Sequence, residues 1–150
     1  VAQGSQPLVS EAYGKGDMKS AKKVLKLSLG TALAISLVIL AAIVVFAEPI
    51  VAIFNSEQSL ELAAYAQIGI KLYFIGFVFA GINIAGCGYL SATGQATGAF
   101  IASISRGFIA IVICAIVMAM LFGMNGVWLS FAVAEALTMV VLVFIIKKQK

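Results

Sequence analysis

The sequence predicts an all-α integral membrane protein with four complete membrane-spanning helices and the inner end of a preceding one. Of the 150 residues, 63% are hydrophobic and only 11% are charged, and the mean hydropathy is +1.12. A soluble domain needs more polar surface than this composition supplies. Four apolar runs reach the length of about 20 residues that a helix needs to cross a bilayer. Lysines gather beside the first and last of these runs, which is typical of membrane flanks and gives no reason to expect a nucleic-acid partner.

The boundaries of the expected elements follow from the polar and basic segments between the apolar runs. Residues 1–14 are expected to be the inner end of an earlier span, because the chain opens in mid-pattern and is expected to be part of a longer protein. Residues 15–26 carry a lysine cluster and the turn-forming Gly16, which follows Gly14, and are expected to form a basic cytoplasmic loop. The complete spans and the short cytoplasmic tail are expected at residues 27–47, 62–90, 99–122, 127–146 and 147–150.

The distribution of charge predicts the orientation of these spans. An even number of spans places residues 15–26 and 147–150 on the same side of the membrane. The connecting segments on the other side hold Glu48, Glu57 and Glu61 and contain no lysine or arginine. The positive-inside rule then puts both lysine clusters in the cytoplasm. We therefore expect a multi-pass protein of the inner (plasma) membrane with a cytoplasmic carboxy terminus.

Several classes of chemistry lack the residues they need. There is no histidine, and Cys87 and Cys114 lie inside apolar runs, where they are expected to pack as small hydrophobic residues. This inventory leaves no material for a disulfide framework or a Cys/His metal site. It also offers no paired-carboxylate motif and no nucleophile with a base. We therefore expect no enzyme activity, no bound metal and no organic cofactor.

The opening segment, "GSQPLVSEAYGKGDMKSAKKVLKLSL", resembles the segment that begins the second half of multidrug and toxin extrusion (MATE) transporters. The residues that carry this resemblance are Gly4, Gln6, Pro7, Ser10, Tyr13 and Gly14. The segments "YLSATGQ", "SISRGFIAIVICAI" and "GVWLSFAVAEAL" resemble the turn after the tenth helix and the last two helices of the family, in the right order. The matching residues in the last two helices are Arg106, Gly126, Trp128 and Glu135. The resemblance covers essentially the whole chain.

This resemblance implies a two-lobe fold of twelve helices with a substrate cavity between the lobes. The family exports organic cations in exchange for Na⁺ or H⁺, so the expected partners are small organic cations, membrane lipid and a missing amino-terminal lobe. By the resemblance, the chain is the end of helix eight plus helices nine to twelve. One departure concerns an acidic cation-binding residue that some branches carry midway along the tenth helix. Here that region holds Ala80 and Gly81, with Asn83 as the nearest polar residue.

Charged residues inside the expected spans are candidates for function, because charge in a bilayer is costly. Lys71 and Glu135 lie at about the same distance from the outer ends of their spans, roughly 13–15 Å deep. We expect them to form a pair, which either fixes helix packing or responds to protons and cations. Glu11 and Arg106 both fall in the inner half of the membrane and are expected to form a gating or structural pair.

Polar residues beside helix-disturbing ones mark a second set of candidates for the ion or substrate pathway. Pro7 removes a backbone hydrogen bond, and Gln6 and Ser10 supply polar groups one turn apart. This segment is expected to be a kinked, water-facing part of the inner mouth. Asn83 is expected either to line a cavity or to hydrogen-bond to a neighbouring helix. The aromatic residues of the span at 62–90 are expected to face lipid or to pack, and Trp128 is expected in an interfacial belt.

The resulting functional hypothesis is a secondary active transporter that exports organic cations by alternating access, coupled to H⁺ or Na⁺. One alternative is a lipid-linked oligosaccharide flippase of the same superfamily. Such a flippase needs cationic residues to meet phosphate, and only Lys71 and Arg106 are candidates. Another alternative is a stand-alone four-helix membrane scaffold protein.

Overall fold

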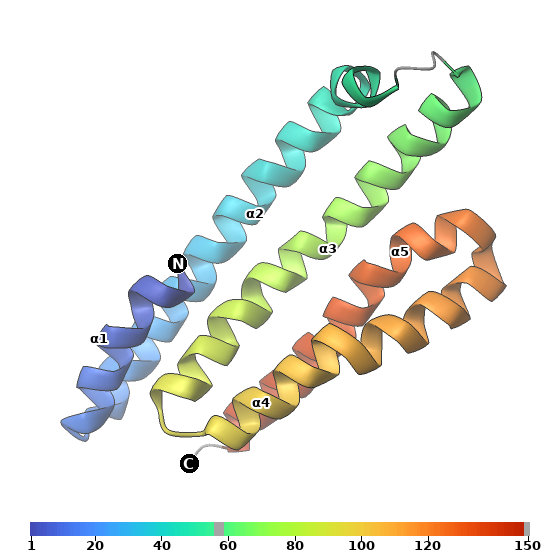
Figure 1. Ribbon diagram of the computed structural model, residues 1–150. Coiled ribbons are helices and arrows are strands. Elements are labelled where there is room, and N and C mark those ends of the chain that lie inside the picture. The colour runs from blue at the N-terminus through green and yellow to red at the C-terminus, as the bar shows by residue number, and fades with distance from the viewer. Residues whose placement is uncertain (56–58, 149–150) are drawn as a thin grey trace.

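The computed structural model describes residues 1–55 and 59–148, and all of its regular elements are helices. They are α1 (Ala2–Gly14), α2 (Met18–Phe54), α3 (Leu60–Ala92), α4 (Ala96–Ile104), the π-helix η1 (Ser105–Ala110) and α5 (Ile111–Lys148). The long helices lie side by side in an elongated bundle, with α3 between α2 and α5 (Figure 1). The expected acidic residue Glu57 and the last two residues of the expected tail lie outside the described residues.

Helix α5 is folded back on itself at Gly123. This residue has φ 60° and ψ −137°, a backbone conformation that residues with a Cβ rarely adopt. Figure 1 shows the chain running up through α4, reversing, and returning along the last part of α5, which ends near the start of α4. We call residues 96–122, which include α4 and η1, the first arm, and residues 124–148 the second arm. The reversal turns one continuous helical stretch into a hairpin.

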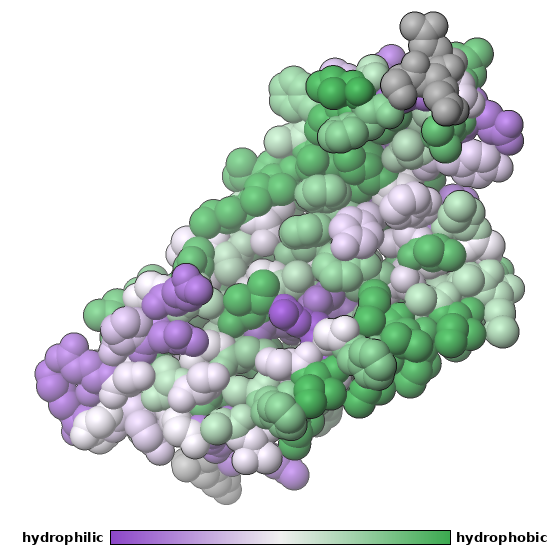
Figure 2. Space-filling view, viewed as in Figure 1, coloured by the Kyte–Doolittle hydropathy of each residue, from purple (hydrophilic) through white to green (hydrophobic). Residues whose placement is uncertain are grey.

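Three continuous helical stretches within the described residues are long and apolar enough to cross a membrane. They are Met18–Phe54, Leu60–Ala92 and Ala96–Lys148. Because the last stretch reverses at Gly123, it contributes two apolar arms to the bundle. The expected count of four bilayer crossings stays a prediction. The molecular surface matches this environment, since Figure 2 shows hydrophobic residues over most of the length of the helices.

The expected basic loop at residues 15–26 is wrong in its extent, because α2 already begins at Met18. The Asp17 side chain accepts hydrogen bonds from the backbone N–H and the hydroxyl of Ser20, which caps the helix. These hydrogen bonds hold the pKa of Asp17 below its ordinary value, so the cap is present at neutral pH and is lost as the pH falls through this lowered pKa. The turn itself is short and uses Gly16 at φ 75°. Lysine and alanine are good helix formers, so the polar segment extends the helix.

Small residues on α3 let the second arm approach closely. Gly69 lies against the indole of Trp128, and Gly76 lies against the ring of Phe131, so that a methyl group at either glycine would collide with these side chains. Asn83 follows Gly76 by the same spacing of seven residues and meets Glu135. Residues at this spacing share one face of a helix. Helix α3 and the second arm therefore run parallel and pack along one continuous seam.

Candidate functional site

The carboxylate of Glu135 is buried in the seam between α3 and the second arm. Glu135 is 4% exposed and Asn83 is fully buried. The Asn83 side-chain amide donates two hydrogen bonds, one to Glu135 Oε2 at 2.7 Å and one to the Glu135 backbone carbonyl at 2.8 Å. One amide thus holds both the carboxylate and the backbone of its neighbour. Its own carbonyl oxygen, Asn83 Oδ1, is buried without a hydrogen-bond partner among the described residues.

Arg106 of η1 supplies the positive charge next to this carboxylate. Its Nε lies 3.7 Å from Glu135 Oε1, and its side chain is 28% exposed. This separation is an ion pair but is too long for a hydrogen bond. The pair joins the first arm to the second arm across the hairpin. Arg106 lies in a π-helical segment, and such widened turns occur frequently at functional sites.

The ion pair opens into a cavity of about 690 Å³ between α2, α3 and the two arms, which we call the acidic cavity. Arg106 and Glu135 provide its charged groups, and Ser36 lines the α2 side. Its other walls carry aromatic rings, which are Tyr73, Phe77, Trp128 and Phe131. The ring of Tyr73 stacks on that of Phe131 at a centroid distance of 4.6 Å. The cavity therefore presents one buried carboxylate, the guanidinium that balances its charge and several aromatic side chains to the same space.

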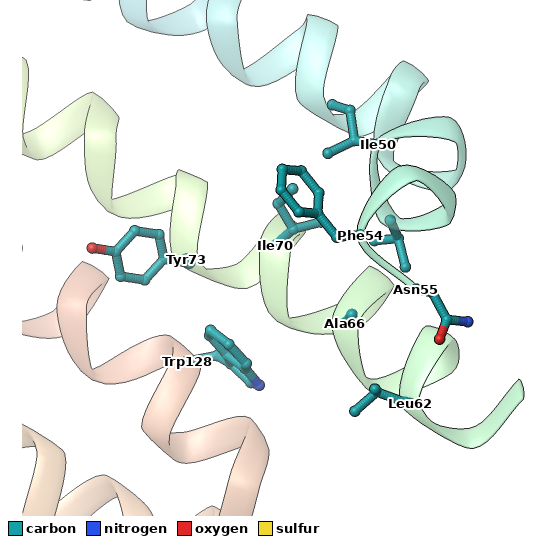
Figure 3. Close-up of a pocket in the computed structure, with 9 residues that line it drawn as sticks. Ile50, Phe54, Asn55, Leu62, Ala66, Ile70, Tyr73 and Trp128 are labelled. Atoms are coloured by element: carbon teal, nitrogen blue, oxygen red, sulfur yellow. The ribbon is translucent and has the colours of Figure 1, made fainter. Parts of the chain in front are cut away.

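A second cavity of about 380 Å³ lies where α2 approaches α3 near the connection between them, and we call it the apolar cavity. Figure 3 shows its lining side chains, including Ile50 and Phe54 from α2 and Ile70 from α3. Among the residues that the structure describes, none that lines it is charged. Tyr73 and Trp128 line both cavities, so the two spaces adjoin at these rings. A molecule in the acidic cavity can therefore extend an apolar part toward the apolar cavity past two aromatic side chains.

Comparison with known proteins places the chain in a family. The model of the MatE family matches residues 1–116. The chain belongs to the MatE family of multidrug efflux transporters. This assignment confirms the family resemblance drawn from the opening segment and from the last two helices.

Named relatives and solved structures of MatE proteins agree with this assignment. The chain is 32% identical over 140 residues to the multidrug export protein MepA of Staphylococcus aureus (strain NCTC 8325 / PS 47), which covers 91% of this chain and 30% of that protein. It is 28% identical over 148 residues to MepA of Staphylococcus haemolyticus (strain JCSC1435), covering 97% of this chain and 31% of that protein. The chain thus spans about a third of the length of these relatives.

Two solved structures share the fold. They are an outward-facing and an inward-facing conformation of a multidrug resistance MATE family transporter of the MOP superfamily. The first has a TM-score of 0.90 and the second 0.87, each at 17% identity and each covering 99% of this chain. The chain covers 33% and 36% of those structures. The helical arrangement of this MatE chain therefore matches the corresponding part of a transporter in both conformations.

The predicted pair of Lys71 and Glu135 is wrong. Lys71 is exposed, and no described residue forms a salt bridge with it. The prediction assumed that equal distances from the starts of two helices mean equal depth. Figure 1 shows that α3 extends well past the reversal of α5, so the two helix starts are not level. The residue of α3 that meets Glu135 is Asn83, which lies more than three turns beyond Lys71.

The predicted pair of Glu11 and Arg106 is also wrong. Glu11 forms a salt bridge with Lys15, one turn further along the chain, and both side chains are exposed. Helix α1 contacts α2 and α3 but not η1. The two predicted partners therefore lie on elements that do not touch, and Arg106 pairs with Glu135 instead.

The predicted pathway residues of α1 lie apart from the acidic cavity. Helix α1 continues through Pro7, Gln6 lies against Gly88, and the Ser10 hydroxyl donates to the backbone carbonyl of Ala92 at 3.4 Å. None of Gln6, Pro7 and Ser10 lines the acidic cavity. Gln6 and Ser10 thus face the end of α3, and their expected role at an inner mouth stays a prediction.

Sequence reasoning missed the assembled site although it named several of its members. Asn83, Arg106 and Glu135 are each candidates in the sequence. The structure shows the hydrogen bond from Asn83 to a neighbouring helix that was one of its two expected roles, but Glu135 as the partner of both Asn83 and Arg106 is not predicted. The aromatic side chains were expected to face lipid or to pack, and Trp128 was expected at an interface. The available signal was the spacing of seven residues through Gly69, Gly76 and Asn83, which marks the face of α3 that the second arm covers.

Proposed function

We propose that the chain is the carboxy-terminal lobe of a secondary active transporter of the plasma membrane. The transporter exports organic cations in exchange for H⁺ or Na⁺ by alternating access, and an amino-terminal lobe completes it. The single observation that carries this proposal is the buried carboxylate of Glu135 in an open, aromatic-lined cavity. Aromatic faces attract organic cations, and the Glu135 carboxylate, whose charge Arg106 balances from 3.7 Å without a hydrogen bond, can exchange this partner for a bound cation. The lysine-bearing end of the bundle then lies in the cytoplasm.

Competition for one carboxylate explains how an exchange can work at this site. Arg106 lies 3.7 Å from Glu135 and makes no hydrogen bond to it, so it balances the charge without closing the site. A substrate cation and a coupling cation each gain by binding the same negative charge. Each therefore lowers the apparent affinity of the site for the other, to an extent set by its own concentration and affinity. If the coupling cation binds in one conformation and the substrate in the other, the two are exchanged across the membrane.

The alternative cargo, a lipid-linked oligosaccharide, has less support from the same site. A phosphate-bearing substrate needs an excess of positive charge in the cavity. Arg106 is the cation that lines the acidic cavity, and Glu135 neutralises it, while Lys71 is exposed and lines neither cavity. The named relatives are multidrug export proteins, which also favours export of drugs.

Gradient-driven transport by the complete transporter tests the proposal. The protein is reconstituted in liposomes loaded with buffer, and uptake or release of a fluorescent cationic dye is followed after a pH gradient or a Na⁺ gradient is imposed. We expect dye movement against its own gradient under one of these conditions, and its loss when an ionophore collapses that gradient. Dye movement that ignores both gradients contradicts exchange.

From the apolar cavity we expect that export of cations with a long apolar arm depends on this lobe more than export of compact cations does. Replacing Ala66 with Phe fills part of that cavity and leaves the acidic cavity unchanged, because Ala66 lines the first and not the second. We expect export of cations with a long apolar arm to fall about tenfold, since the lost burial of an apolar group is worth about 1–3 kcal/mol. Export of compact cations is expected to be unchanged. Efflux assays with a series of alkyl-chain lengths on one quaternary ammonium head measure this.

A matched control separates this effect from general damage to α3. Ala64 lies on the same helix and is exposed, and it lines neither cavity. Ala64→Phe should therefore transport the whole series as the parent does. If Ala66→Phe lowers export of short and long cations equally, the apolar cavity does not receive the apolar arm.

A further inference from the structure

The start of α2 carries four lysines on one face, which we call the lysine stripe. It consists of Lys19, Lys22, Lys23 and Lys26. Because α2 begins at Met18, these positions are helical, and their spacing of three and four residues places them along one side of the helix. All four are exposed. Figure 2 shows a hydrophilic surface at this end of the bundle. A segment that reads as a flexible basic loop is therefore a fixed, one-sided array of positive charge.

The opposite face of the same helical segment is packed into the bundle. Ala21 and Leu25 form a buried cluster with Val9 of α1 and Tyr89 of α3. This packing fixes the rotation of α2 about its axis. The lysine stripe consequently points away from α1 and α3 and cannot turn inward to find counter-charges.

No carboxylate of the described chain neutralises the lysine stripe. Asp17 is occupied by its hydrogen bonds to Ser20, and Glu11 is paired with Lys15. None of the four lysines of the stripe forms a salt bridge with any residue that the structure describes. Like charges one turn apart on a helix repel one another. The stripe therefore gains from an external anion that contacts several lysines at once.

The position of the stripe along α2 indicates which anion this is. Continuing along the same side of the helix, Leu33, Leu37 and Val44 are exposed and apolar. In a membrane-spanning helix such residues lie against lipid tails. Counted back from Leu33, Lys26 lies about two turns and Lys19 about four turns beyond these lipid-facing residues, so the stripe begins at the level where phospholipid headgroups carry their phosphates and continues outward from it. Lysine side chains extend naturally to that level.

We propose that the lysine stripe binds the headgroups of anionic phospholipids, so that α2 is anchored at the membrane boundary by its charged extension. The geometry favours lipid over nucleic acid or an acidic protein because the same side of the helix continues as an apolar, lipid-facing surface. Binding of this kind is electrostatic, so it depends on net positive charge and weakens as salt is raised. It does not require that the protein transport anything.

A lipid-retention experiment on the purified complete transporter tests this proposal. The protein is equilibrated in mixed micelles with equal amounts of phosphatidylglycerol and phosphatidylcholine, washed, and the retained lipids are quantified by mass spectrometry. We expect the parent to be enriched in phosphatidylglycerol, and the variant with Lys19→Gln, Lys22→Gln, Lys23→Gln and Lys26→Gln to lose about fivefold or more of that enrichment. Raising the salt concentration should reduce enrichment in the parent.

Two control variants keep the result specific to the stripe. Replacing the same four lysines with arginine keeps the charge and should keep the enrichment. Replacing Lys147 and Lys148 with Gln removes charge from the end of α5 and should leave most of the enrichment in place. Unchanged enrichment in the four-glutamine variant overturns the proposal, and so does an equal loss in the arginine variant or in the α5 variant.

Discussion

Replacing Glu135 with Gln is expected to reduce export of cationic dyes by the complete transporter by about thirtyfold or more, with its amount in the membrane unchanged. Glutamine has nearly the same shape as glutamate and still accepts a hydrogen bond from the Asn83 amide. What it lacks is the negative charge. Truncating one partner of a buried charge pair costs about 2–5 kcal/mol, and under the proposed function the lost carboxylate is also the group that binds the transported cations. Arg106 would remain beside a neutral site and repel them.

Dye efflux from cells measures this effect, with Glu48→Gln as the matched control. Glu48→Gln is the same substitution on α2, at a residue that is exposed and lines neither cavity. The control should export dye as the parent does. Efflux by the Glu135 variant at the rate of the parent, at equal abundance, would show that Glu135 serves packing alone. Parent and variant that both fail, with good expression, would point to another cargo.

The fold class of this chain is readable from sequence because it depends on composition along one dimension. A run of about 20 apolar residues forms a helix in a bilayer whatever its neighbours are, since each backbone group must find its partner within the segment. The turn at residues 93–95 and the reversal at Gly123 also coincide with polar or glycine-rich stretches. The same reasoning erred at residues 18–26, where charge was taken to mean loop although lysine is compatible with helix.

The contacts of the candidate site were not readable because they depend on how two helices are placed along and around each other. Lys71 and Asn83 are both polar residues of α3, and only the offset between α3 and the second arm selects Asn83 as the neighbour of Glu135. That offset is set by where the hairpin reverses. Arg106 and Glu135 are likewise brought together by the reversal at Gly123, which packs the second arm against the first. The number of residues from a predicted helix end gives neither the offset between α3 and the second arm nor the position of the reversal.

Close packing and the buried charge depend on the same residues. Gly69 and Gly76 have no side chain between α3 and the second arm, so Trp128 and Phe131 reach the α3 backbone. The close approach of α3 and the second arm that these glycines permit extends to Asn83, whose amide lies within hydrogen-bonding distance of Glu135. A larger residue at Gly76 would separate the helices beside the site and admit water to the carboxylate. The same close packing of α3 against the second arm therefore places the aromatic walls of the acidic cavity and buries its carboxylate.

Replacing Gly126 with Ala is expected to destabilise the folded transporter by about 3 kcal/mol, because the added methyl group overpacks a site that has no room to expand. A Cβ at this position would overlap the backbone carbonyl of Met118 in the first arm. A backbone group cannot rotate away as the end of a side chain can, so the two arms would have to separate. Arg106 and Glu135 lie on those arms, and the separation would also weaken their pairing.

Thermal unfolding of the purified complete transporter, followed by size-exclusion chromatography after heating, measures the loss as a lowered Tm. Gly30→Ala is the matched control, because a Cβ at Gly30 meets nothing within 4 Å and alanine is the better helix former. Its Tm is expected to equal or slightly exceed that of the parent. A Gly126 variant with the Tm of the parent would mean that the arms do not meet at Met118. In that case the contact between Arg106 and Glu135 would have to be maintained by the α3 seam alone, through Asn83 and the glycines that precede it.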